Sequence, residues 1–185
     1  FSNATLSSSS SEAVVIEGGN SVTLTGVDIT GNNSKLNSQS HVNTNVLIYQ
    51  SMSGDASMGS STFDMTGGTM TSLTGYMFHV TNTTTEISLS GVNFNYASDS
   101  NVFLSASEDS WGKSGSNGGN VTLNLVGQSI GGAVTMEGSS SVAVNMDSNS
   151  TWTLTGDSYI SSINDLSNVN LNGYSLYISG ESVAQ

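Results

Sequence analysis

A run of apolar residues that returns at long intervals is the feature that most constrains how this chain can fold. Five such runs begin at Val14, Val46, Met77, Val102 and Val134, at spacings of 25 to 32 residues. A sequence period of this length is typical of solenoids, in which each repeat buries its apolar face only against the neighbouring repeats. The period is too long for a plain meander, so we expect one structural unit per run.

Short strands of alternating polarity lie between the runs. At 21–26, Val22 and Leu24 alternate with hydroxyl residues, which places the two apolar side chains on one face of a strand. The same alternation occurs at 86–91, 120–125 and 151–156. A single glycine follows three of these strands and precedes another short strand, which predicts a corner and not a hairpin. These three glycines are Gly26, Gly91 and Gly156.

The predicted fold is an all-β, single-stranded, right-handed parallel β-helix of about five long coils with a tighter C-terminal cap. Helix formers are scarce, and no stretch has apolar residues at helical spacing. We expect one domain over 1–185, with a Ser-rich lead-in at 1–11 and closing coils at 150–180. The competing all-β fold is a sandwich, which needs hairpin turns of which Asn172-Gly173 is the one clear example.

Composition limits the function classes more than it identifies one. Ser, Thr, Asn and Gly fill roughly half of the chain, which raises the possibility of disorder, but 35% of the residues are hydrophobic and regularly placed. Lys and Arg number 2 against 14 Asp and Glu, so the net charge is −12. A chain this acidic is not expected to bind nucleic acid or an anionic membrane surface. No apolar run is long enough to predict membrane insertion, and the absence of cysteine excludes disulfides and thiolate chemistry.

One glycine-rich loop carries the candidate ligand-binding residues. The segment ASEDSWGKSGSNGGN, the longest insertion between runs, groups an aromatic ring with carboxylates, an ammonium and an amide. An exposed Trp can stack on a sugar ring while neighbouring polar groups bond its hydroxyls. The alternative is that the Trp packs back onto the body as a cover and the charges are solvated. The candidates are Glu108, Asp109, Trp111, Lys113 and Asn117.

No catalytic or metal-binding constellation is predicted. Both lysines, Lys35 and Lys113, lie in loops and arginine is absent, so a polysaccharide lyase would lack its base. Asp64 is the sole acid expected on the outward face of the alternating strands, where a glycosidase would need two carboxylates. His41 is expected to be exposed and His79 to point outward from a strand, which gives no Ser/His/Asp arrangement. No cofactor is expected, since even a Ca²⁺ site at the candidate loop lacks the required spacing of oxygen ligands.

Two segments carry a resemblance to known proteins. The stretch STWTLTGDSYISSINDLSNVNLNGYSLYISG at 150–180 resembles the closing coils of autotransporter-type passenger domains and related bacterial surface β-helix proteins. Its matching positions are Trp152, Leu154, Gly156, Ser158, Ile160, Leu166, Val169 and Leu171. The segment WGKSGSNGGNVTLNL at 111–125 is similar to a loop of extracellular β-helical repeat proteins of gut bacteria, some of them described as carbohydrate-binding.

The resemblance implies a pectin-lyase-like fold and a secreted or cell-surface, adhesin-like protein. We therefore expect a non-enzymatic module that binds glycans or host-surface molecules. A polysaccharide-active enzyme is the main alternative. Ice binding by stacked threonines, such as Thr23 with Thr25 and Thr153 with Thr155, is a remote one.

Overall fold

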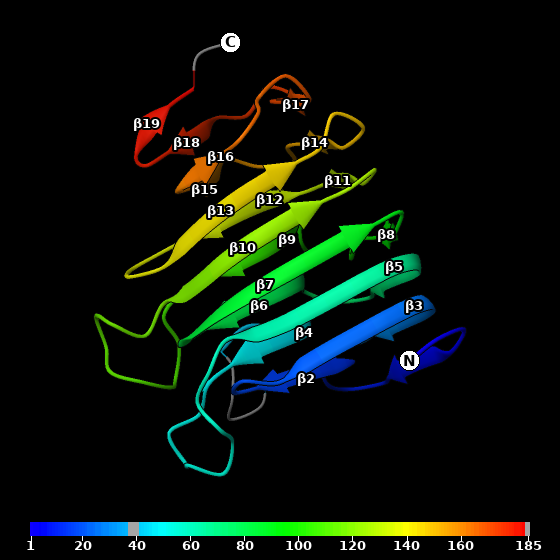
Figure 1. Ribbon diagram of the computed structural model, residues 1–185, viewed down its shortest axis with the longest axis vertical. Helices are drawn as coiled ribbons and strands as arrows, with labels where there is room; N and C mark the ends of the chain where they lie inside the picture. Colours follow the sequence, from blue (N-terminus) through cyan, green and yellow to red (C-terminus); the bar gives the residue numbers. More distant parts are fainter. Residues whose placement is uncertain (37–40, 184–185) are drawn as a thin grey trace.

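The structure, a computed structural model, describes residues 1–36 and 41–183 and is built of β-strands alone. Within these ranges there is no helix, and therefore none that could cross a membrane. In the described part of the chain the strands form four sheets whose neighbours run parallel, except for one antiparallel pair at the C-terminal end. Figure 1 shows the strands stacked along the long axis of the molecule, with the N-terminus at one end and the C-terminus at the other. The predicted all-β class and parallel pairing are confirmed.

Sheet A is the longest sheet and contains the alternating strands. In spatial order it consists of β1 (Thr5–Ser8), β3 (Ser21–Gly31), β5 (Ser61–Ser72), β7 (Thr83–Ser90), β10 (Gly119–Leu125), β13 (Ser141–Met146) and β16 (Ser162–Ile163), with β8 (Asn93–Asn95) paired to the second half of β5. Because the strands are in register, residues of one kind form columns along the stack. Leu24, Met65 and Leu89 are one such column on the buried face.

Sheet B contains the apolar runs. Its strands are β2 (Val14–Glu17), β4 (Thr44–Tyr49), β6 (Tyr76–Thr81), β9 (Val102–Ala106) and β12 (Ala133–Met136). The chain passes from sheet A to sheet B and back again repeatedly, which is consistent with a β-solenoid. The first residues of the runs do not all align with one another, because Phe78 and not Met77 aligns with Val46, and Leu104 and not Val102 aligns with Phe78.

A third side of the stack is divided into two parts. Its lower part is the second half of β3 and β5 together with β8, and its upper part is sheet C, made of β11 (Ser129–Gly131), β14 (Thr151–Thr153) and β17 (Val169–Asn170). The segment 151–156 therefore does not belong with the alternating strands of sheet A, as its polarity suggested, because Trp152 pairs with Ile130 of sheet C.

The C-terminal end is wound more tightly than the rest. Sheet D consists of β15 (Ser158–Ile160), β18 (Leu176–Ile178) and the antiparallel β19 (Glu181–Ser182). Hydrogen bonds such as Asn172 Nδ2 to the Leu154 oxygen join residues 18 positions apart there. Sheet D lies beyond β12 on the side of sheet B, and the Ser158 hydroxyl, which accepts from the Val134 N–H at 3.1 Å, links the two.

The interior is one continuous apolar cluster that includes side chains from all sheets. Its aromatic centre is Phe78, whose ring meets Phe63 and Phe103 edge to face at centroid distances of 5.3 and 5.5 Å. Trp152 is fully buried and donates its indole N–H to the Gly132 oxygen at 2.9 Å. Burial of this apolar cluster is the main stabilising contribution to folding. Each circuit, by which we mean one passage of the chain around the stack, has little core of its own.

A column of glycines forms the corner after sheet A. Gly26, Gly67, Gly91 and Gly127 occupy equivalent places in successive circuits, and their φ angles lie between 56° and 64°. Other residues are strained in this left-handed region, which explains why glycine recurs there. The predicted corners at Gly26 and Gly91 are confirmed, whereas Gly156 lies next to sheet D and is not one of the residues with positive φ.

Candidate functional site

Two long loops cover the outer face of sheet B and form what we call the lid, defined as residues 32–36, 41–43 and 107–118. Leu47 and His79 alternate with core residues along β4 and β6, so their side chains point out of sheet B, yet both are fully buried. Trp111 packs against Tyr49, with 6.1 Å between the ring centroids. The lid therefore adds a second, smaller buried layer on this side.

Asp109 is the centre of the lid. Its side chain is 2% exposed and accepts from both histidines: Oδ1 lies 2.5 Å from His41 Nδ1, and Oδ2 lies 3.1 Å from His79 Nε2. The His41 backbone N–H donates to Oδ2 at 3.0 Å, and the Ser110 N–H donates to Oδ1 at 2.7 Å. One carboxylate thus joins both loops of the lid to β6.

The pKa of Asp109 reflects this environment. Burial alone would raise it, but the hydrogen bond from the His79 ring, the N–H of His41, the charge of His79 and the N–H of Ser110 together hold the pKa well below its usual range. Asp109 therefore stays ionised and acts as a fixed acceptor between two imidazole rings. His41 is 75% exposed, as expected, whereas His79 points outward but is covered.

The lid brings Ser110, His41 and Asp109 together, but not as a catalytic relay. Ser110 Oγ lies 3.1 Å from His41 Nε2 and also 3.1 Å from Asp109 Oδ1. In a relay the imidazole stands between the carboxylate and the hydroxyl, which places those two oxygens ~7 Å apart if both bonds lie in the ring plane. The hydroxyl and the carboxylate share one side of the ring here, so the arrangement cannot pass a proton from Ser110 through His41 towards Asp109.

The other predicted site residues have different surroundings. Glu108 holds the lid in place, since its carboxylate accepts from the Gly115 N–H at 3.0 Å and from the Ser139 hydroxyl at 3.1 Å. These bonds, the Gly115 N–H foremost, lower the pKa of Glu108. Asn117 is buried and donates to the backbone oxygens of Asp109 and Trp111.

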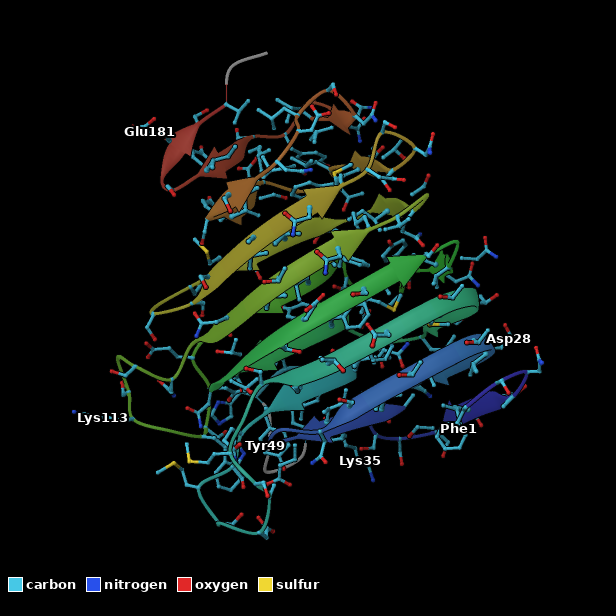
Figure 2. All side chains as sticks on the ribbon, viewed as in Figure 1. Phe1, Asp28, Lys35, Tyr49, Lys113 and Glu181 are labelled. Atoms are coloured by element: carbon cyan, nitrogen blue, oxygen red, sulfur yellow. The ribbon has the colours of Figure 1, made fainter. Side chains whose placement is uncertain are left out.

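Lys113 is exposed at the outer tip of the lid, where Figure 2 shows it pointing away from the stack. The predicted loop residues are therefore not assembled around one open site. Trp111 is packed against Tyr49, Asn117 is buried, and Glu108 and Asp109 are occupied by hydrogen bonds. Across residues 1–36 and 41–183, no group of three or more His, Asp or Glu side chains is placed to hold a metal ion.

An open groove of about 460 Å³ lies on the third side of the stack, away from the lid. Its volume falls within the ~300–1,000 Å³ range of ligand pockets. The lining combines backbone at three glycines with amide, hydroxyl and aromatic side chains, and none of the lining residues is charged. They are Gly91, Val92, Asn93, Phe94, Tyr96, Gly127, Gln128, Ser129, Ile130, Gly131, Thr151 and Thr153.

Gln128 and Tyr96 set the ends of this groove. The buried Gln128 amide accepts from the Val92 N–H at 2.7 Å and donates to the Val92 oxygen at 2.8 Å and to the Ser129 oxygen at 2.7 Å. At the other end the Tyr96 hydroxyl accepts from the Gly131 N–H at 3.3 Å. Burial raises the pKa of Tyr96, which keeps this hydroxyl neutral.

No sequence motif marks the groove. Gln128 occurs in an unremarkable segment, VGQSIGG, and neither it nor Tyr96 belongs to a motif. The only available signal was indirect: the apolar runs Met77 and Val102 are closer together than the other runs, so the circuit that contains Tyr96 is short. The groove between β8 and β11 on the third side depends on which residues of successive circuits align with one another. No local sequence pattern encodes that alignment.

The outer face of sheet A is a set of mixed polar columns. One column reads Thr23, Asp64, Ser88, Asn124 and Asn145. Its amides bond one another, as in the 2.9 Å contact from Asn145 Nδ2 to Asn124 Oδ1. Asp64 is not the sole acid on this face, because Glu86 also points outward and accepts from Asn124 Nδ2 at 2.6 Å. A column of such mixed residues does not present the regular threonine array that ice binding would require.

Comparison with known proteins found no family model, no curated protein and no solved structure that matches this chain.

Proposed function

We propose that this chain is a non-catalytic binding module that holds an uncharged, extended polymer in the groove between β8 and β11. The polymer is a neutral glycan or an uncharged polypeptide segment of a host surface. The module is a right-handed parallel β-helix, secreted or displayed at the cell surface, and functions as an adhesin-like element. The extracellular setting draws its support from the resemblance of 150–180 to bacterial surface β-helix proteins.

The observation that carries this proposal is the absence of charge in the groove of a chain whose net charge is −12. An anionic polymer would be repelled by the acidic surface, and a cation would find no carboxylate among the lining residues to replace its water shell. A neutral ligand avoids both costs, and the amides and hydroxyls of the lining match its donors and acceptors.

The exposed polar residues and the aromatic floor are suited to such a ligand. Asn93, Ser129 and Thr151 are exposed at the rim, and since the Thr151 hydroxyl donates to the Ser129 hydroxyl at 2.9 Å, the Asn93 amide and the Ser129 O–H are the donors available to a bound polymer. Phe94 and Tyr96 lie behind them, with 6.1 Å between their ring centroids. Apolar surface flanked by a few fixed polar groups is the usual composition of small-ligand sites.

The test is binding of the purified protein to an array of neutral glycans and uncharged peptides, beside acidic and basic members of each class. We expect binding to neutral members only. Asn93→Asp places a charge at the rim of the groove and should weaken binding at least tenfold. Asn145→Asp is the matched control, because it makes the same change at an exposed position of sheet A and should leave binding unchanged.

Three results would overturn the proposal. The first is that no neutral polymer binds, and the second is that Asn93→Asp binds as well as the original chain. The third is turnover: if incubation with polysaccharides releases new reducing ends or unsaturated products, the chain is a polysaccharide-active enzyme.

A further inference from the structure

The groove lies where the ladder of strands on the third side is interrupted. β8 pairs only with β5, and β11 pairs only with β14, within the part of the chain that the structure describes. At the other described levels of the third side the neighbouring backbones pair directly, as in β3 with β5, β5 with β8, β11 with β14 and β14 with β17. β8 and β11 therefore face each other across the groove with strand edges that do not meet.

Side chains replace the missing backbone contacts at both ends of the groove. Gln128 bonds both the N–H and the oxygen of Val92, in the way that a neighbouring strand would. Because a glutamine side chain is interposed, the two backbones stand a side chain apart instead of one strand spacing of ~4.8 Å. Tyr96 spans the other end through its contact with Gly131.

The apolar column behind the third side is interrupted at the same level. Below the groove the inward residues in register are Ile29, Met70 and Phe94. Above it they are Ile130, Trp152 and Val169. Both Phe94 and Ile130 line the groove, and although Ile130 is buried, Phe94 is only half-buried, so Phe94 lacks the neighbour that completes the column elsewhere.

We propose that an extended polypeptide segment of a partner inserts between β8 and β11 as an added strand. It runs parallel to both, with one apolar side chain pointing inward against Phe94 and Ile130 and with polar neighbours beside Asn93 and Ser129. β8 and β11 have three residues each, so the slot accepts about three residues, or ~10 Å of strand. The segment is uncharged, as the lining is.

A polypeptide fits this slot better than a glycan because its main chain carries alternating N–H and C=O groups at the spacing of a strand edge. Strand edges are the usual template for adding a strand, with main-chain bonds giving affinity and side-chain pockets giving specificity. On β11 the incoming main chain would replace the Gln128 amide at the Ser129 oxygen and the Tyr96 hydroxyl at the Gly131 N–H. The inference rests on the proposed function and names the ligand class for the same groove.

The experiment uses ¹⁵N-labelled full chain and NMR titration with short capped peptides. The probe is acetyl-Gly-Thr-Ile-Thr-Gly-amide. We expect it to shift the backbone amide signals of β8 and β11 and to leave those of the lid unchanged. Replacing its Ile by Asp, or methylating the Ile nitrogen, should each weaken binding at least tenfold. The methylated peptide keeps the apolar side chain and removes a main-chain donor, so it separates strand insertion from simple apolar contact.

A neutral oligosaccharide of similar length is titrated in parallel. If the oligosaccharide shifts these signals and the peptide does not, strand insertion is wrong while the proposed binding module stands. Shifts from the peptide that are indifferent to methylation also overturn insertion. If neither ligand binds, both proposals fail.

Discussion

Replacing Asp109 by asparagine should loosen the lid, and the structure indicates by how much. The asparagine keeps the shape of the side chain but turns one acceptor oxygen into a donor. His41 is 75% exposed and can exchange its lost bond for water at little cost. His79 is fully buried, so its Nε2–H is left without an acceptor when the amide nitrogen faces it; when the amide oxygen faces His79, the Ser110 N–H and the His41 ring lose their acceptor instead. A buried donor without a partner costs ~1–3 kcal/mol, and bonds to a charged acceptor lie at the upper end, so we expect a loss of ~2–3 kcal/mol.

Urea denaturation followed by circular dichroism measures this change in the free energy of unfolding. Asp64→Asn, which removes a carboxylate from the outer face of sheet A, is the matched control and should change stability by less than ~0.5 kcal/mol. A double-mutant cycle with His79→Gln isolates the pair that matters. A coupling energy below ~0.5 kcal/mol between positions 109 and 79 would refute the reasoning, because the buried contact would then contribute nothing specific.

The same contact gives a pH dependence with a definite sign. The pKa of Asp109 in the folded protein lies below its usual value of ~3.9, so the folded state holds the carboxylate more tightly ionised than the unfolded state does. The stabilisation is fully present above pH ~4 and is lost as the pH falls through the lowered folded pKa. The stability difference between the original chain and Asp109→Asn should therefore be constant near neutral pH and shrink in acid. A difference that grows in acid would contradict the assignment.

Three further predictions concern the stack itself. Gly67→Ala should cost ~1–2 kcal/mol in urea denaturation, since φ is +64° but the added methyl meets nothing within 4 Å, whereas Gly68→Ala should lose more than ~4 kcal/mol because the methyl would lie 2.1 Å from the Val27 backbone oxygen of the preceding circuit. Equal losses would show that packing between circuits is looser than described. Phe78→Ala should cost ~3–5 kcal/mol and Met58→Ala less than ~0.5, because Phe78 is fully buried and Met58 is 86% exposed. Burial, and then the nearby Glu17 carboxylate, raise the pKa of Tyr49 to about 12, so stability should fall between pH ~10 and 12 and the fall should be smaller in Tyr49→Phe.

Local patterns in the sequence were sufficient to predict the repeating strands. Alternation at Val22 and Leu24 reports which face is buried, because a strand has a side-chain period of two whatever lies beside it. Corners were found where Gly26 and Gly91 stand, since a positive φ leaves few other choices. The sheet of Trp152 was predicted wrongly, because its Thr-Trp-Thr-Leu pattern indicates a strand but does not indicate which sheet that strand joins.

The lid shows why the candidate site was harder to predict. Glu108 to Asn117 were recognised as a loop with interesting chemistry, but the partners of Asp109 come from residues 68 and 30 positions away. His79 appeared to be an ordinary outward residue of a strand because nothing near it in sequence indicates that a loop will cover it. Contacts of this kind depend on how circuits stack, and a single sequence read by its periodicity carries no record of them.

The sheets are interrupted at two places, between β8 and β11 on the third side and between β12 and β15 on the side of sheet B. The two interruptions lie at different levels of the stack. Sheet A is continuous from β1 to β16, whereas side-chain bonds of Gln128 and Tyr96 join the third side across the groove, and side-chain bonds of Ser158 and Ser161 join the side of sheet B where β12 gives way to β15. A pull along the long axis is therefore transmitted without interruption through sheet A, which acts as a spine. Each of the other two sides is joined at one level by a few side-chain bonds, so under tension the molecule should bend around sheet A before any strand of sheet A separates.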